Sequence, residues 1–252
     1  MRYKRRRKSR SAALYVPVGA FLIIALATLG IGVFLRVVEI EVSGVSRYTR
    51  DDIVLASGIS PGDNMLFLDS DAAVRRIRMA LPYISEIKIE YALPATVKIV
   101  IKESIGIAVI EYQNKALLID SSGRVLGLVD TVREGLVEIL GFYPVDAEVG
   151  GRLRAVPDSE TQLSSLIVVL TAFERAGLLD SISYLDVTHI AAIRFRYIDR
   201  FTVTLGDSGD ADYKLSLLPG MVEKIDEEKS VNATGRIDIS DPSGESRFIE
   251  DW

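Results

Sequence analysis

The sequence contains no cysteine and one histidine, His189, among its 252 residues. Without cysteine the chain has no disulfide and no thiolate ligand for zinc, so an exported domain must be stabilised by a packed apolar core. A single histidine excludes most metal sites and most histidine-based catalysis. Its setting in Tyr-Leu-Asp-Val-Thr-His favours a turn residue over a ligand. The sequence therefore predicts no metal site and no cofactor.

Acidic residues are absent from residues 1–36, which hold eight of the 30 Lys and Arg residues. The rest of the chain holds the other 22 basic residues and all 35 acidic ones. The net charge of −5 is therefore the sum of a basic N-terminal end and an acidic remainder. A run of 22 uncharged residues, Leu14 to Leu35, follows the basic tail. As a helix it would be roughly 33 Å long, enough to cross a hydrocarbon core of about 30 Å. The pattern predicts a membrane-spanning helix over 14–35.

This end of the chain has two other interpretations. A cleavable signal peptide is suggested by Ala25-Leu26-Ala27, but the apolar run exceeds the usual signal-peptide core, and cleavage would expose apolar residues. A nucleic-acid arm is disfavoured because topology and anionic lipids already account for the basic residues. The excess of basic residues before the span predicts a cytoplasmic tail over 1–13 and an external location for everything after Val37.

Five short elements are predicted within about the next 65 residues. Apolar residues alternate at period two in the strands and recur at i, i+3 and i+7 in the helices. The predicted elements are a strand over 38–42, a helix from Thr49 to Gly58, a helix from Asp69 or Ser70 to Pro82, and strands over 84–91 and 96–102 joined by a hairpin at 92–95. The order is β-α-α-β-β.

One stretch in this region imitates a catalytic motif. Gly58-Ile59-Ser60-Pro61-Gly62 matches the G-x-S-x-G nucleophile elbow of serine hydrolases. An elbow requires a strand before the serine, whereas Ser60 follows a helix end, and Pro61 lacks the N–H that an oxyanion hole needs. The stretch is therefore predicted to be a turn, and an anchored surface hydrolase becomes a weak competitor. We predict that the protein is not an enzyme.

The rest of the chain reads as a second module of short strands and two helical regions. Gly177 is predicted to end the first helix, and Pro219-Gly220 to kink or break the second. The predicted elements are strands over 107–112, 115–120 and 124–129, a helix over 159–176, strands over 182–187, 192–197 and 201–206, a helix from Asp212, and a closing strand over 237–239.

This architecture resembles the FtsQ/DivIB family of cell-division proteins, whose first exported domain is a POTRA domain. The matching motifs of the first module are Val42-Ser43-Gly44, Ser57-Gly58-Ile59 with Gly62, Leu68-Asp69, Leu93-Pro94-Ala95-Thr96 and Lys102-Glu103. The second module resembles the family's β domain through Asp120 with Gly123, Glu138-Ile139-Leu140-Gly141, Leu185-Asp186-Val187 and Val203-Thr204-Leu205-Gly206.

The resemblance implies a single-pass membrane protein with an α+β ectodomain. Its parts would be a cytoplasmic tail over 1–13, a transmembrane helix over 14–35, a POTRA domain over 37–104, and a mixed or antiparallel β domain with flanking helices over 105–250. It also implies a non-catalytic scaffold at the division septum of a bacterial cell membrane. The implied partners are bitopic proteins of the DivIC/FtsB and FtsL types, with the septal peptidoglycan synthase contacted indirectly. The alternative is a POTRA-bearing, membrane-anchored translocation or assembly factor, or a cell-wall-binding module.

The expected binding device is the last strand of an open sheet, to which a partner strand can add. By resemblance this edge comprises 236–240 and 245–249. Phe248 and Trp252 are candidate aromatic anchors, although Phe248 is equally well interpreted as a core residue and Trp252 as a frayed end. The expected partner-binding residues are Arg236, Ile237, Ile239, Ser246, Phe248, Ile249 and Trp252.

Overall fold

The computed structural model describes residues 15, 17–24, 26, 30, 35–130, 135–241 and 247–250. The predicted tail over 1–13 lies outside these residues, as does much of the predicted span over 14–35. Within the described part of the chain, no helix combines the length and apolarity that crossing a membrane requires. The structure divides into two compact units, one comprising the residues through Ile77 with Ser85–Glu103, the other Arg78–Ile84 with the residues from Ser104 on.

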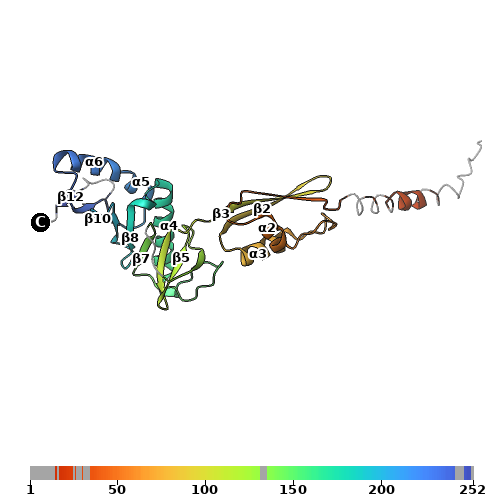
Figure 1. Ribbon diagram of the computed structural model, residues 1–252, viewed down its shortest axis with the longest axis horizontal. Coiled ribbons are helices and arrows are strands. Elements are labelled where there is room, and N and C mark those ends of the chain that lie inside the picture. The colour runs from red at the N-terminus through yellow and green to blue at the C-terminus, as the bar shows by residue number, and fades with distance from the viewer. Residues whose placement is uncertain are drawn as a thin grey trace, which may run out of the picture. The chain divides into compact units, whose positions relative to one another are not determined.

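The first unit is a three-stranded sheet with two helices (Figure 1). The central strand β3 lies between β1 and β2, and β1 runs parallel to it, with Ile40 opposite Val97. Ile53 on α2 and Ile77 on α3 are fully buried and supply the apolar side of each helix. The element bounds are β1 Glu39–Ser43, α2 Arg50–Ser57, α3 Ser70–Ala80, β2 Ile84–Ala92 and β3 Thr96–Glu103. The predicted β-α-α-β-β order is confirmed.

Local sequence explains where these helices begin and end. Thr49 and Asp52 form the predicted capping box, and Gly58 ends α2 in the left-handed conformation with φ 66°. Asp69, rather than Ser70, caps α3, because its carboxylate accepts the Ala72 N–H at 2.8 Å. These side chains satisfy backbone donors that a helix start leaves without partners.

The second unit is built on a nine-stranded mixed sheet in the order β12-β11-β10-β9-β8-β7-β4-β5-β6. The pairs β4–β7, β7–β8 and β10–β11 are parallel, and the other pairs are antiparallel. The strands are β4 Ala108–Tyr112, β5 Lys115–Ile119, β6 Val125–Val129, β7 Val137–Leu140, β8 Ile182–Asp186, β9 Ile193–Tyr197, β10 Phe201–Gly206, β11 Gly235–Asp238 and β12 Arg247–Glu250.

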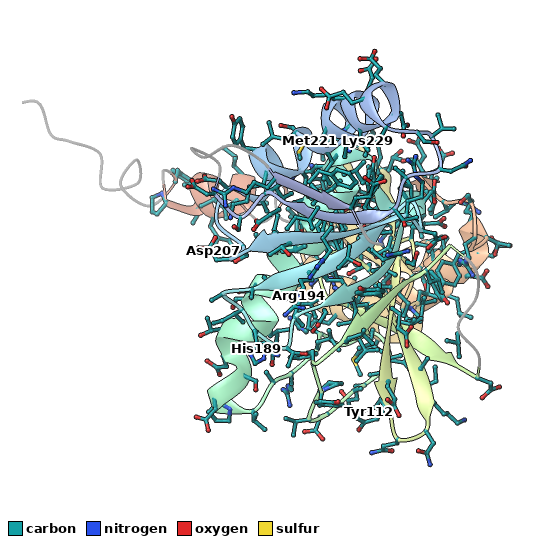
Figure 2. The ribbon with its side chains drawn as sticks, turned by 90° about the vertical axis from the view of Figure 1, so that its left-hand side faces the viewer. Tyr112, His189, Arg194, Asp207, Met221 and Lys229 are labelled. Carbon is teal, nitrogen blue, oxygen red and sulfur yellow. The ribbon has the colours of Figure 1, made fainter. Side chains whose placement is uncertain are left out.

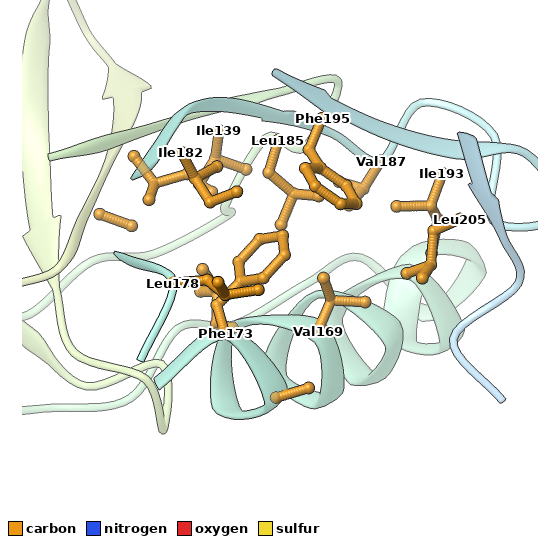
Figure 3. Packing of buried hydrophobic residues seen from close by; sticks show 14 of the residues in the cluster. Ile139, Val169, Phe173, Leu178, Ile182, Leu185, Val187, Ile193, Phe195 and Leu205 are labelled. Atoms are coloured by element: carbon orange, nitrogen blue, oxygen red, sulfur yellow. The ribbon is translucent and has the colours of Figure 1, made fainter. Parts of the chain in front are cut away.

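Helices α4 (Glu160–Ala176), α5 (Ala211–Ser216) and α6 (Leu218–Glu228) contribute buried residues to the same core as the strands. Two short 3-10 turns, Pro157–Ser159 and Leu179–Ser181, flank α4. At the centre Phe173 of α4 meets Phe195 of β9 edge to face, with ring centroids 5.0 Å apart (Figure 3). The long helix therefore fixes the central strands by packing.

The last helical region is interrupted as the sequence predicts. Alpha5 ends at Ser216, and α6 carries Pro219 in its first turn, where a missing N–H costs no hydrogen bond. Leu218 and Ile225 of α6 are buried in the core, beside the strands that lead to the end of the chain. The break gives α6 its own direction, and α6 becomes one wall of the site described next.

Candidate partner-binding edge

Strand β12 is the end strand of the nine-stranded sheet among the described residues. It pairs antiparallel with β11, with Arg236 opposite Ile249 and Asp238 opposite Arg247. The Gly235 N–H donates to the Arg200 oxygen just before β10, and the Ile239 N–H donates to the Thr204 oxygen in β10. The alternate residues Arg236 and Asp238 therefore direct their backbone groups toward β12. Because these directions alternate along a strand, Ile249 and Arg247 face β11. The register therefore directs the backbone N–H and C=O of Phe248 and Glu250 away from the sheet.

Gly235 allows β12 to approach β11 closely. A Cβ atom at this position would lie 2.3 Å from the Ile249 carbonyl oxygen and 2.7 Å from Cε2 of the Phe248 ring. Real Cβ atoms do not make such contacts. The close approach of β12 to β11 thus depends on glycine at position 235, and so does the position of the Phe248 ring.

The Phe248 ring packs on Phe201 edge to face, with centroids 5.9 Å apart and an interplanar angle of 84°. It is partly buried and joins the edge of the core cluster. Its outer surface helps to line a pocket of about 350 Å³ between β12 and α6. Figure 2 shows Met221 and Lys229 of this pocket close together at the last helix. The lining residues are Met221, Lys224, Ile225, Glu228, Lys229 and Phe248.

Arg200 connects the elements beneath this edge. Its guanidinium donates to Asp226 Oδ1 at 2.6 Å and to the backbone oxygens of Ala233 and Ser230 at 3.0 and 3.3 Å. The same group lies over the Phe201 ring, 4.7 Å from its centroid. Arg200 therefore ties α6 and the segment before β11 to the ring on which Phe248 packs.

The open face of the sheet beside β12 is rich in arginine. Ile193, Phe195 and Tyr197 of β9 point into the core, so the alternate residues of that strand lie on the opposite face. Rows of paired residues place further arginines of β11 and β12 on this face. The face carries Arg194, Arg196, Arg236 and Arg247, but also acidic residues. Arg194 lies directly opposite Asp186, and Arg247 directly opposite Asp238, so part of the positive charge is balanced within the sheet.

The predicted site residues separate into different roles. Ile237 and Ile239 are buried, with at most 1% of their surface exposed, and the Ile239 N–H donates to the Thr204 oxygen at 2.9 Å. Their side chains belong to the core rather than to an accessible surface. Arg236 is exposed, and Ile249 is 54% exposed. Ser246 and Trp252 lie outside the described residues.

Other chemistry-bearing residues hold structural positions. His189 is an exposed turn residue between β8 and β9, as the sequence predicts. Lys214 is buried and donates to Asp207 Oδ1 at 2.9 Å, and this hydrogen bond holds the pKa of Asp207 below its usual value. The Ser60 N–H donates to Asp63 in the turn after α2. In the described ranges no group of three or more metal-ligating side chains comes together.

Sequence reasoning missed Gly235, Arg200 and the pocket against α6. A glycine directly before a predicted strand was an available signal for close backbone approach. No local signal identified Arg200, because its partners lie 26 to 33 residues further along the chain. The pocket was not predicted because Phe248 and the residues around α6 that line it are about 20 residues or more apart in the sequence.

Comparisons with known proteins first identify the class of domain that the chain carries. Residues 35–104 match the model of the FtsQ-type POTRA domain, so the chain carries a POTRA domain ahead of its mixed sheet. The cell-division protein FtsQ of Geobacter sp. strain M21 is 32% identical over 211 residues, covering 81% of this chain and 73% of that protein. The cell-division protein DivIB of Clostridium botulinum strain Hall is 24% identical over 249 residues, covering 98% and 93%.

The chain belongs to the FtsQ/DivIB family of non-catalytic cell-division proteins. A solved structure of the major extracytoplasmic domain of DivIB from Geobacillus stearothermophilus is also similar to it, at 14% identity. That structure covers 50% of this chain and 97% of its own, with a TM-score of 0.33. The sequence relatives confirm, at the level of the family, the resemblance expected from the motifs.

Proposed function

We propose that this protein is a divisome scaffold that binds bitopic partners of the DivIC/FtsB and FtsL types on the outer face of the membrane. In this role it helps to control septal peptidoglycan synthesis, and it contacts the synthase only through these partners. Family membership supports a role in cell division. The partners and the septal role are our proposal.

One observation carries the binding part of the proposal. Beta12 ends the sheet with the backbone groups of Phe248 and Glu250 directed outward by its register. An extended partner segment that adds to this edge gains main-chain hydrogen bonds, and side-chain pockets supply specificity. In the pocket against α6, Met221, Ile225 and Phe248 offer apolar contact to a side chain of the added strand, beside three charged residues that could bind a polar end of that side chain.

The membrane placement follows from the uncharged run over 14–35. Residues 17–24 are helical, and the large apolar side chains of Val18, Phe21, Leu22 and Ile23 are at least half exposed, which supports a lipid-facing segment. We assign 1–13 to a cytoplasmic tail and 14–35 to the span. We further assign 37–104 to the POTRA domain and 105–250 to the β domain, both outside the membrane and located at the division septum.

Replacing Glu250 with proline tests the edge. Proline removes one outward N–H and is tolerated on edge strands, whereas Glu250→Ala keeps the N–H and removes the same side chain. Both variants lose the exposed 3.5 Å contact with Lys229, which is worth little in water. We expect Glu250→Pro to weaken partner binding by about tenfold, equivalent to 1.4 kcal/mol or one net hydrogen bond, and Glu250→Ala to bind almost normally.

The measurement is co-purification of the full-length chain with its membrane-embedded partners, quantified for the two variants in parallel. Equal binding by both variants would show that main-chain pairing at β12 is not the binding device. Equal loss in both would assign binding to the carboxylate of Glu250 instead.

A further inference from the structure

The point where the chain enters the first unit is fixed by backbone hydrogen bonds. The Val37 N–H donates to the Asp63 oxygen at 2.8 Å, and the Gly62 N–H donates back to the Val37 oxygen at 2.7 Å. The Met65 N–H donates to the Leu35 oxygen at 2.8 Å. Leu35 is the last residue of the proposed span, so no linker separates the membrane from this ladder. The loop that follows α2 must therefore lie where the span leaves the bilayer.

That end of the unit exposes large apolar side chains. Leu66 and Phe67, in the loop after α2, are 59% and 84% exposed. Leu93, at the tip of the β2–β3 hairpin, is 73% exposed, and Val38 is 71% exposed. The hairpin lies at the same end, because the Ala95 oxygen accepts the Val38 N–H at 2.8 Å. Figure 1 shows the hairpin and the loop at the end of the sheet where the chain enters. We name Val38, Leu66, Phe67 and Leu93 the apolar tip.

The loop also satisfies its own backbone donors. The Leu66 N–H donates to Asn64 Oδ1 at 2.9 Å, and the Phe67 N–H to the Asn64 backbone oxygen at 3.0 Å. With the Met65 bond described above, three successive N–H groups are paired within the protein. In the hairpin, Pro94 has no N–H to satisfy. Unpaired backbone donors are what prevent most loops from entering lipid, so this loop is suited to an apolar medium.

The opposite end of the same sheet has a different character. There β3 ends at Glu103, whose carboxylate accepts the N–H groups of Ser46 and Arg47 at 2.9 Å. Exposed apolar residues also occur elsewhere on the unit, at Leu55 and Met79, but singly and on helices. At the end where the chain enters, four such side chains occur on segments that are hydrogen-bonded to residues 35–39, next to internally paired donors. We interpret this combination at the end of the proposed span as a membrane-facing surface.

We propose that the apolar tip inserts into the interfacial region of the outer leaflet and seats the POTRA domain on the bilayer. Phe67 and Leu66 enter among the acyl chains near the headgroups, where aromatic residues of membrane proteins concentrate. The occupant of this surface is lipid rather than a protein partner. The inference rests on the proposed span over 14–35.

Site-directed spin labelling provides the test, since a chain without cysteine accepts one label at a chosen position. The full-length chain is reconstituted into vesicles of phosphatidylethanolamine and phosphatidylglycerol as three variants: Phe67→Cys, Met79→Cys and Leu22→Cys. Met79 is 82% exposed, matching Phe67, but lies roughly 14 Å along α3 from its start at Ser70. Leu22 reports on the span. Collisions with oxygen and with a water-soluble nickel chelate are measured at each label.

The expected result is lipid-like accessibility at positions 67 and 22, with loss of the nickel signal, and aqueous accessibility at 79. If 67 behaves like 79 while 22 is in lipid, the apolar tip does not contact the membrane and the anchor still stands. If 67 and 79 are both in lipid, the whole unit lies on the bilayer and seating by the tip is wrong. If the label at position 22 shows aqueous accessibility, residues 14–35 do not span the membrane, and the inference about the apolar tip is wrong as well.

Discussion

Substituting Gly235 with alanine is the sharpest test of how the binding edge is built. The added Cβ would lie 2.3 Å from the Ile249 oxygen and 2.7 Å from the Phe248 ring, against ordinary contacts of about 3.5 Å. Something must move by roughly 1 Å. Among the described residues β12 is paired with a strand on one side only, so it is the element expected to shift. Its displacement separates Phe248 from Phe201, a pair worth about 0.5–1.5 kcal/mol.

The loss of this aromatic contact and the overpacking around the added methyl group together should lower the free energy of unfolding by about 1–3 kcal/mol. The measurements are thermal unfolding and hydrogen–deuterium exchange of the full-length chain in detergent micelles, with exchange followed over β11 and β12. Faster exchange is expected there, while the central strand β9 keeps its protection. Partner binding should fall with it.

Gly220→Ala is the matched control for this substitution. A Cβ at Gly220 meets nothing within 4 Å, and the residue lies inside α6. The same chemical change should therefore leave stability unchanged or raise it by up to about 1 kcal/mol through helix propensity. If Gly235→Ala is as stable as Gly220→Ala and exchanges no faster over β12, the close approach of the last strand is not a constraint, and the description of the edge is wrong.

Three further predictions concern the supports of the fold. Arg200→Ala should lower the free energy of unfolding by about 1–3 kcal/mol, because it removes the hydrogen bonds to Asp226 and to the Ala233 oxygen. Chemical denaturation measures this free energy, and an unchanged value would refute the prediction. Asp207 has a lowered pKa in the folded state, through its hydrogen bond from Lys214 and then that from the Gly209 N–H, so its stabilising effect is present above its ordinary value near 3.8 and lost as pH falls through the folded value. The Tm difference between wild type and Asp207→Asn should therefore shrink below about pH 4, and a constant difference down to pH 2 would contradict the linkage. Thr49→Ala should cost about 1 kcal/mol by removing the cap of α2, as measured by urea denaturation.

Local elements were predictable because their determinants are local. The strand Phe201–Gly206, the Thr49–Asp52 capping box and the break at Pro219 were each predicted from a few neighbouring residues. The order of the strands was not predictable in this way. The parallel pairing of β10 with β11 brings together segments separated by α5 and α6, and it is fixed by long-range packing rather than by a turn.

The candidate site was predictable in part. The edge strand was expected near its observed position, although the bounds moved from 245–249 to Arg247–Glu250. The roles of individual side chains were not predictable, because alternation alone could not say which residues of β11 face the core. Ile237 of β11 and Ile239 just after it are buried, and the Ile239 N–H donates to the Thr204 oxygen of β10. The outward-facing backbone groups of this edge therefore belong to β12. The apolar tip could not be predicted from the sequence, since the loop that carries Leu66 and the hairpin that carries Leu93 are placed at one end of the unit by hydrogen bonds to residues 35–38.

In-cell photocrosslinking from two edges of the same sheet tests the central claim most directly. A photoreactive amino acid is placed at Ile249 on β12 or at Leu128 on β6, the strand at the other end of the sheet; these side chains are 54% and 48% exposed. The account predicts that position 249 captures a small bitopic division protein and that position 128 does not. Capture of such a protein from 128 alone, or of cell-wall polymer or an exported client from 249, would contradict it.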